Sequence, residues 1–249
     1  FDPNNPVFRI QDWALSLQII TLENVYGLDP DGIHRTEHED SASLSCIGLR
    51  WGGGQQPAPG SLHLTARFEP QGLRVQIKAQ APEPIRAVKI LIRHLAPVTA
   101  LDQFDDERAI PPEGLLDRYP NQLRLPLLCV RQLDGVTLGF RWEDAEHRSK
   151  RFAVYRERFG DDYTVECIHE EDARHFATQI EVPDWIFARV DDPTAFRAAQ
   201  LTFNERQAGL KRWEERTDVP DWARQLRLVV TLHGMHWSGY TFNTYAQMI

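Results

Sequence analysis

The stretch SLHLTARFEPQGLRVQIKAQ, residues 61–80, carries the pattern that decides the fold. Apolar and polar residues alternate on both sides of the central Pro-Gln-Gly, as they do in strands that bury one face. Proline and glycine in the centre are typical of a tight turn. The stretch therefore predicts a β-hairpin with one buried face on each strand.

Similar segments continue outward from this hairpin. Further strands are predicted in residues 42–51, 85–95, 123–133 and 136–144 and in the segments RFAVYRERF, DYTVECIHEE and FATQIEVP. Residues 96–122 are predicted to form a long polar loop. Short strands joined by tight turns predict a mainly β protein, with a large antiparallel β-sandwich over residues 1–190.

The pattern changes at DDPTAFRAAQLTFNERQAGLKRW, residues 191–213. Asp191 or Asp192 is a suitable N-cap, and Pro193 fits the first helical position. Large and small apolar residues then recur at steps of three, four and seven: Phe196, Ala199, Phe203, Leu210 and Trp213. This spacing predicts an amphipathic helix over residues 193–213.

A connector containing Pro220 and Trp222 leads into LRLVVTLHG, residues 226–234. The apolar run at residues 226–232 is typical of a strand buried on both faces, as in a parallel sheet. Such a strand needs partners on both sides, so we expect the chain to be cut inside a second domain. In the alternative, residues 226–232 join the edge of the sandwich and the chain is complete.

Composition restricts the partners. The 249 residues carry a formal net charge of -8 without clustered Lys or Arg, which argues against nucleic acid. No apolar run is long enough to span a membrane, and the N-terminus lacks the features of a signal peptide. Because the first residue is Phe1, we expect that residues upstream were removed or omitted. We expect a cytoplasmic protein whose three cysteines, Cys46, Cys129 and Cys167, are buried thiols.

The helix at residues 193–213, the motif VPDW at residues 219–222 and the strand LRLVVTLHG together resemble glycoside hydrolases related to families 36 and 31. The resemblance implies a mutarotase-like β-supersandwich over residues 1–190. It also implies a linker helix and connector over residues 191–225. Residues 226–249 would then be the first β/α unit of a truncated (β/α)8 barrel.

The resemblance also implies a function. The chain would be the non-catalytic N-terminal part of a glycoside hydrolase, supporting a barrel that acts on an oligosaccharide or glycoside. The catalytic carboxylates of such enzymes lie at the ends of later barrel strands, outside this chain, and no cofactor is expected. The alternative is a stand-alone carbohydrate-binding or structural β-sandwich.

One loop is the candidate substrate site. A loop that follows a barrel strand lies at the face where barrel active sites form. Aromatic rings pack on the C–H faces of sugars, and planar polar groups bind hydroxyls. Side chains of both kinds follow the predicted barrel strand: His233, His236, Trp237, Tyr240 and Asn243. We therefore expect this loop to contact saccharide.

Metal sites are the weaker interpretation. His233 and His236 are three residues apart but lack a visible third ligand. Cys167, His169 and His175 lack the fourth ligand of a structural zinc site. Acidic groups at residues 102–107 and 170–172 lack the glycine-turned spacing of a calcium loop.

Four tryptophans lie in or beside predicted strands: Trp13, Trp51, Trp142 and Trp185. We expect them in the core, because large aromatic side chains are mostly buried. An exposed one would instead serve as a platform for a sugar.

Overall fold

The computed structural model describes residues 8–10, 13–51, 53–102, 105–158, 160–209, 211 and 213–226. Mainly antiparallel β-structure forms this part of the chain, as the sequence predicts. The chain divides into two compact units between Gly209 and Leu210.

The first unit contains the strands. They are β1 (Phe8–Ile10), β2 (Trp13–Thr21), β3 (Val25–Leu28), β4 (Ile33–Glu37), β5 (Ser41–Trp51), β6 (Gln56–Glu69), β7 (Gly72–Leu95), β8 (Val98–Leu101), β9 (Glu107–Arg108), β10 (Leu115–Tyr119), β11 (Leu127–Gln132), β12 (Thr137–Glu143), β13 (Lys150–Arg156), β14 (Tyr163–Glu170) and β15 (Ala177–Arg189). A 3-10 turn, η1 (Pro30–Gly32), precedes β4. The hairpin predicted in residues 61–80 is confirmed by the pairing of β6 with β7.

Strand β7 belongs to two layers. Its residues 72–80 lie between β6 and β15, whereas its residues 87–93 lie between β2 and β14. The sequence predicts two separate strands here, and the structure has a single strand. Pro82 and Pro84 fall where the partners change, since proline has no N–H to donate to a ladder.

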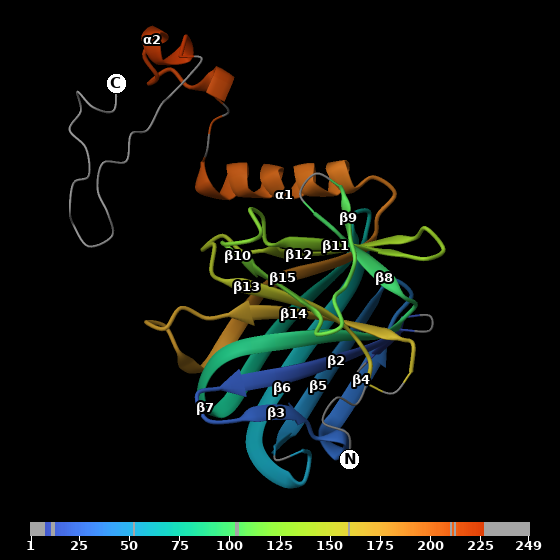
Figure 1. Ribbon diagram of the computed structural model, residues 1–249. Coiled ribbons are helices and arrows are strands. Elements are labelled where there is room, and N and C mark those ends of the chain that lie inside the picture. Colours follow the sequence, from blue (N-terminus) through green and yellow to red (C-terminus); the bar gives the residue numbers. More distant parts are fainter. Residues whose placement is uncertain are drawn as a thin grey trace, which may run out of the picture. The chain divides into compact units, whose positions relative to one another are not determined.

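The layers pack face to face (Figure 1). Layer 1 contains β5, β6, the first part of β7, β15, β12, β11 and β8, and layer 2 contains β2, the second part of β7, β14, β13 and β10. Inward-facing side chains of both layers form one core cluster. In it, Trp13 of layer 2 meets Phe187 of layer 1 edge to face, with ring centroids 5.6 Å apart.

The tryptophans are divided between core and surface. Trp142 and Trp185 are fully buried, and Trp13 packs against the core from a partly buried position. The expectation that Trp51 is in the core is wrong, because it is the last residue of β5 and is exposed. Cys46, Cys129 and Cys167 are buried free thiols, as predicted.

Helix α1 (Pro193–Ala208) lies across the outer face of β11 and β12 (Figure 1). The Asp192 side chain accepts hydrogen bonds from the backbone N–H groups of Thr194 and Ala195. The helix is shorter than the predicted residues 193–213, because Gly209 adopts the left-handed conformation that ends helices.

A glycine on β12 makes room for the helix. A Cβ at Gly139 would lie 2.7 Å from the Phe196 ring, so only glycine allows this close approach. The Arg141 guanidinium lies 5.5 Å from the centroid of the same ring. Phe196 and Gln200 are the buried residues of α1, whereas Phe203 is half-buried.

The long polar loop predicted for residues 96–122 is wrong. This segment contains β8, β9 and β10, which pair respectively with β11, β8 and β13. These strands are too short to show clear alternation, and their pairing depends on distant parts of the chain. Sequence periodicity alone therefore misses them.

The described part of the second unit contains η2 (Trp213–Glu215) and α2 (Asp221–Arg224). The motif VPDW spans the start of α2, where Pro220 is the N-cap residue. The predicted barrel strand lies outside the described residues after Leu226, so the barrel stays a prediction. Among the described residues, no helix is both long and apolar enough to cross a membrane.

Candidate functional site

The five residues predicted to contact saccharide lie outside the described residues. They are His233, His236, Trp237, Tyr240 and Asn243. Their role stays a prediction, and the geometry of a candidate site comes from the sandwich.

A groove of about 400 Å³ lies on the outer face of layer 2. We call it the outer groove, and its lining comes from β2, β7, β13, β14 and the segment around β10: Ile20, Lys89, Glu113, Gly114, Leu115, Leu116, Arg151, Ala153, Tyr155, Glu166 and Ile168. Strand alternation places these side chains outside, because Glu166 and Ile168 flank the inward-facing Cys167. The lining therefore combines apolar side chains with charged and hydroxyl groups.

Glu166 is the centre of the polar part of the outer groove. Its Oε1 accepts a hydrogen bond from Lys89 Nζ at 2.9 Å and from the Tyr155 hydroxyl at 3.1 Å. In the register, Glu166 is paired with Ala153 and Leu91, each two residues from one of these donors. Both donors are thus diagonal cross-strand neighbours of the carboxylate.

The electrostatics keep the Tyr155 hydroxyl as a hydrogen-bond donor. Burial raises the pKa of Tyr155, and the nearby Glu166 carboxylate raises it further. The phenol therefore stays protonated and donates to Glu166. Both hydrogen bonds use Oε1, so Oε2 takes part in neither, and an ammonium group such as that of Lys89 has three donors. The cluster holds polar atoms in fixed positions beside an apolar wall.

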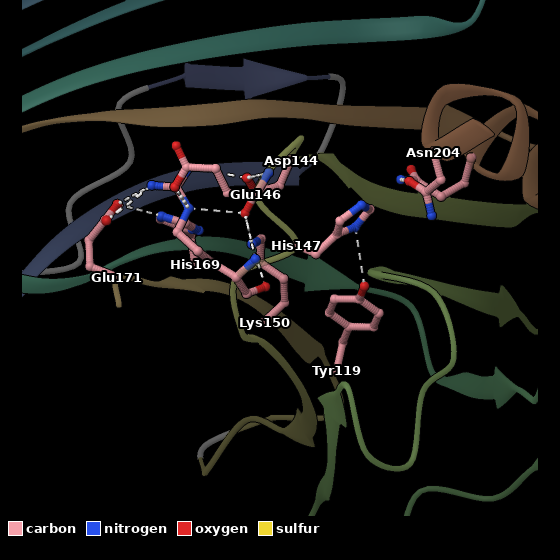
Figure 2. Close-up of polar contacts among 10 residues, drawn as sticks. Tyr119, Asp144, Glu146, His147, Lys150, His169, Glu171 and Asn204 are labelled. Carbon is pink, nitrogen blue, oxygen red and sulfur yellow. Dashed lines mark hydrogen bonds and ion pairs between the residues drawn. The ribbon is translucent and has the colours of Figure 1, made fainter. Parts of the chain in front are cut away.

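A second polar cluster is buried where β12, β13 and β14 end or begin (Figure 2). We call it the buried network: Asp144, Arg148, Lys150, His169 and Glu171. Lys150 Nζ donates to Asp144 Oδ2 at 2.6 Å and to the Arg148 carbonyl at 2.8 Å. His169 Nε2 lies 2.7 Å from Glu171 Oε1, and Arg148 bonds both carboxylates.

The charges of the buried network are balanced. Burial lowers the pKa of His169 to about 4 and that of Lys150 to about 8. Burial alone would raise the pKa of Asp144, but Arg148 and Lys150 hold it below its usual range. A neutral His169 with two carboxylates and two cations fixes the segment between β12 and β13 to the end of β14. The network therefore has a structural role, because removing one partner would leave a buried charge without its pair.

Glycoside hydrolysis needs a carboxyl group that stays protonated opposite an ionised one. Among the described residues, four carboxyl groups have a shifted pKa, and in all four the pKa is lowered. They are Glu107, Asp144, Glu171 and Asp218. Cationic or donor partners cause each of these decreases. None of these four carboxyl groups is therefore tuned as a general acid.

The other candidates from the sequence have structural partners. Cys167 and His169 share the inward face of β14, as alternation predicts, but His169 contacts Glu171 and His175 is exposed. Asp105 pairs with Arg197 of α1, and Asp102 Oδ1 accepts from the Asp106 N–H. Within the described ranges, no group of three His, Cys, Asp or Glu residues could hold a metal ion.

Sequence reasoning missed Lys89, Tyr155 and Glu166. Alternation in residues 85–95, in RFAVYRERF and in DYTVECIHEE places their polar side chains outside the core. It does not show which outward side chains meet, because that depends on the register of three strands.

The chain matches no protein-family model and no curated protein sequence. A candidate aldose 1-epimerase of Escherichia coli K12 is 11% identical, with 69% of this chain and 78% of that chain covered and a TM-score of 0.43.

Two further solved structures are similar at the same level. A 4-alpha-glucanotransferase from Thermococcus litoralis is 10% identical, with 75% of this chain and 29% of that chain covered and a TM-score of 0.41. A galactose mutarotase related enzyme from Lactobacillus acidophilus is 9% identical, with 72% of this chain and 84% of that chain covered and a TM-score of 0.41. At these identities and TM-scores, no residue role carries over to this chain.

Proposed function

We propose that this chain is the glycan-contacting, non-catalytic N-terminal part of a glycoside hydrolase. In this proposal the sandwich is a mutarotase-like supersandwich, and residues 226–249 begin a (β/α)8 barrel. The resemblance carried by residues 193–213, VPDW and LRLVVTLHG supports the proposal. So does the order of an antiparallel sandwich followed by a helix that packs on it.

The outer groove is the single observation that carries the glycan contact. A sugar presents both hydroxyl groups and C–H surfaces, so its site needs fixed polar atoms beside apolar ones. Lys89, Tyr155 and Glu166 supply the former, and Ile20 and Ile168 supply the latter. Their mutual hydrogen bonds hold the polar atoms in place before a ligand arrives.

In the sandwich, Glu107, Asp144 and Glu171 have lowered pKa values, so none of these three carboxyl groups is suited to be the general acid. Hydrolysis would then depend on carboxylates of later barrel strands. In the longer protein, the loop with His233, His236, Trp237, Tyr240 and Asn243 would contact the same substrate class.

A stand-alone carbohydrate-binding module is the second candidate. The outer groove favours it, because all of its lining comes from the sandwich. The two candidates differ in what happens when the chain is extended along its natural sequence.

The first test measures glycan binding. Maltohexaose, cellohexaose and mannohexaose are titrated into the 249-residue chain by calorimetry, with Glu166→Gln as the variant. We expect at least one glycan to bind and the variant to weaken its affinity about tenfold, since a bond to a charged group is worth about 1.5–3 kcal/mol. The matched control is Glu181→Gln, in an exposed Lys–Glu pair on layer 1. Equal affinity in the Glu166 variant would exclude the outer groove.

The second test measures turnover of aryl glycosides. We expect none with this chain and turnover with a version extended by about 300 residues, the scale of a complete barrel. In the extended version, Trp237→Ala should lower turnover about tenfold if that ring stacks on sugar. Turnover by the short chain, abolished by changing carboxylates within residues 1–190, would place the chemistry in the sandwich.

A further inference from the structure

A second groove lies at one open end of the sandwich. It has a volume of about 390 Å³, within the range of small-ligand sites (about 300–1,000 Å³). We call it the end groove, and its lining is Trp13, Phe68, Gly72, Leu73, Gln132, Asp134, Val136, Phe187, Ala188 and Arg189. None of these residues lines the outer groove.

The end groove contains an aromatic ring, that of Phe68, which lies on the inward face of β6 but is largely exposed to solvent. On β6, the inward-facing residues Leu62, Leu64 and Ala66 are buried in the core. Phe68 is the next residue on that face, yet 61% of it is exposed. The ring thus presents apolar surface to the groove, where a ligand can cover it.

The end groove also contains a buried amide. On β11, Leu128 and Val130 face the core, and Gln132 is the next residue on that face. Only 7% of Gln132 is exposed, and its Nε2 has no hydrogen-bond partner among the described residues. A buried donor without an acceptor costs about 1–3 kcal/mol, so an arriving acceptor would be favoured.

The remaining walls complete a polar and aromatic site. Trp13 contacts Phe187 edge to face at the inner wall. Asp134 and Arg189 are exposed at the rim, and Asp134 Oδ1 accepts from the Val136 N–H at 2.9 Å, which holds the turn. A Cβ at Gly72 would lie 2.4 Å from the Phe187 carbonyl oxygen, so the wall is tightly packed there.

We propose that the end groove is a separate saccharide-binding site that takes one sugar unit of a glycan. The C–H face of the sugar packs on Phe68, and a sugar hydroxyl accepts a hydrogen bond from Gln132 Nε2. Asp134 and Arg189 bind further hydroxyls at the rim. An aromatic face, a planar amide and charged rim groups are the components that sugar recognition uses.

The test follows the side-chain amide of Gln132 by NMR in the 249-residue chain. The variant Gln132→Leu identifies the resonance by its loss, and maltohexaose, cellohexaose and mannohexaose are the probes. We expect at least one probe to shift this resonance. Gln132→Leu and Phe68→Ala should each weaken binding of that probe at this site at least tenfold, measured from the shifts of neighbouring backbone amides.

Two controls separate binding from folding. Ile47→Ala removes an exposed apolar side chain of β5 that does not line the groove, and it should leave binding unchanged. Gln132→Leu should not lower the unfolding midpoint, because leucine removes an unpaired donor and adds no polar group. A lowered midpoint would show that the amide has a structural partner and would overturn the proposal.

The outcome is independent of the outer groove. A shift of the Gln132 resonance that persists in Glu166→Gln supports the end groove even if the outer groove binds nothing. If none of the three probes moves the resonance at concentrations well above a Kd of about 1 mM, the end groove is not a saccharide site. The same conclusion follows if neither variant weakens binding.

Discussion

Lys89 and Lys150 each pair with a carboxylate, and the two pairs differ in the face on which they lie. Lys150 and Asp144 are fully buried in the network, with side chains 0% and 2% exposed. Lys89 and Glu166 are 18% and 13% exposed at the wall of the outer groove. Since side chains alternate along a strand, one residue step decides which role a lysine has.

A third pair completes the series. Lys78 and Glu181 are 60% and 68% exposed on layer 1, with Nζ and Oε2 3.3 Å apart. The same two kinds of charge thus occur in three environments. Burial, rather than residue type, distinguishes a pair that stabilises the fold from one that is available to a ligand.

Breaking the buried pair should have the largest effect. Lys150→Met leaves the Asp144 carboxylate buried with only Arg148 as a cation. We expect the free energy of unfolding to fall by about 3–5 kcal/mol, as measured by urea denaturation. The double variant Lys150→Met with Asp144→Leu should recover part of this loss. A decrease below about 1 kcal/mol in the single variant would mean that the pair is not desolvated.

Acid should destabilise the protein through the same network. Burial lowers the pKa of His169 to about 4, whereas the unfolded chain has a value near 6.5. Between pH 6.5 and 4 the unfolded state therefore binds more protons, and the free energy of unfolding falls as the pH falls, by up to roughly 3 kcal/mol. The lowered pKa of Glu171 acts in the same direction at the acidic end.

His169→Gln should remove the part of the slope between pH 6.5 and 5, measured by urea denaturation at several pH values. His175→Gln is the control, because His175 is exposed. An unchanged slope in the His169 variant would mean that this histidine is protonated in the folded state.

The partly buried pair of Lys89 and Glu166 should contribute less to stability than the fully buried pair. Lys89→Met should lower the free energy of unfolding by about 1 kcal/mol, because Glu166 keeps the Tyr155 hydrogen bond and partial solvent contact. Glycan affinity, measured by calorimetry, should fall several-fold. A stability loss as large as that of Lys150→Met would make this pair structural.

The exposed pair should contribute least. Lys78→Met should change the free energy of unfolding by no more than about 0.5 kcal/mol and leave glycan affinity unchanged. Urea denaturation and calorimetry under the same conditions check both. A larger change here would show that exposure does not order the three pairs.

Much of the fold follows from the sequence because strands with one buried face alternate visibly, as in residues 61–80. The start of α1 is equally readable, since Asp192 and Pro193 occupy their usual positions. The end of α1 cannot be predicted in the same way, because the apolar spacing continues past Gly209, whereas the helix ends there. Nor does the spacing show that Gln200 is buried and Phe203 only half-buried, which depends on the strands beneath the helix.

The candidate sites depend even more on tertiary structure. From the sequence alone, Glu166 is one of many charged residues on the outward face of a strand. Only the strand register shows that it lies beside Lys89 and Tyr155. Gln132 reads as the polar end of a strand, and only the open end of the sandwich makes its amide distinctive. Short-range patterns therefore predict which face a residue occupies, and long-range pairing decides what it meets.

The single long strand β7 has a consequence for the order of assembly. The second part of β7, residues 87–93, pairs with two strands that are distant in sequence. One is β2, near the start of the chain, and the other is β14, which follows β7 by about 70 residues. The first part of β7, residues 72–80, is complete only when β15 has also paired with it. Contacts of such long sequence separation make folding slow, in the range of milliseconds to seconds. During synthesis, β7 would emerge with an unpaired edge, and a chaperone or rapid closure by β2 and β6 would protect it until β14 and β15 leave the ribosome.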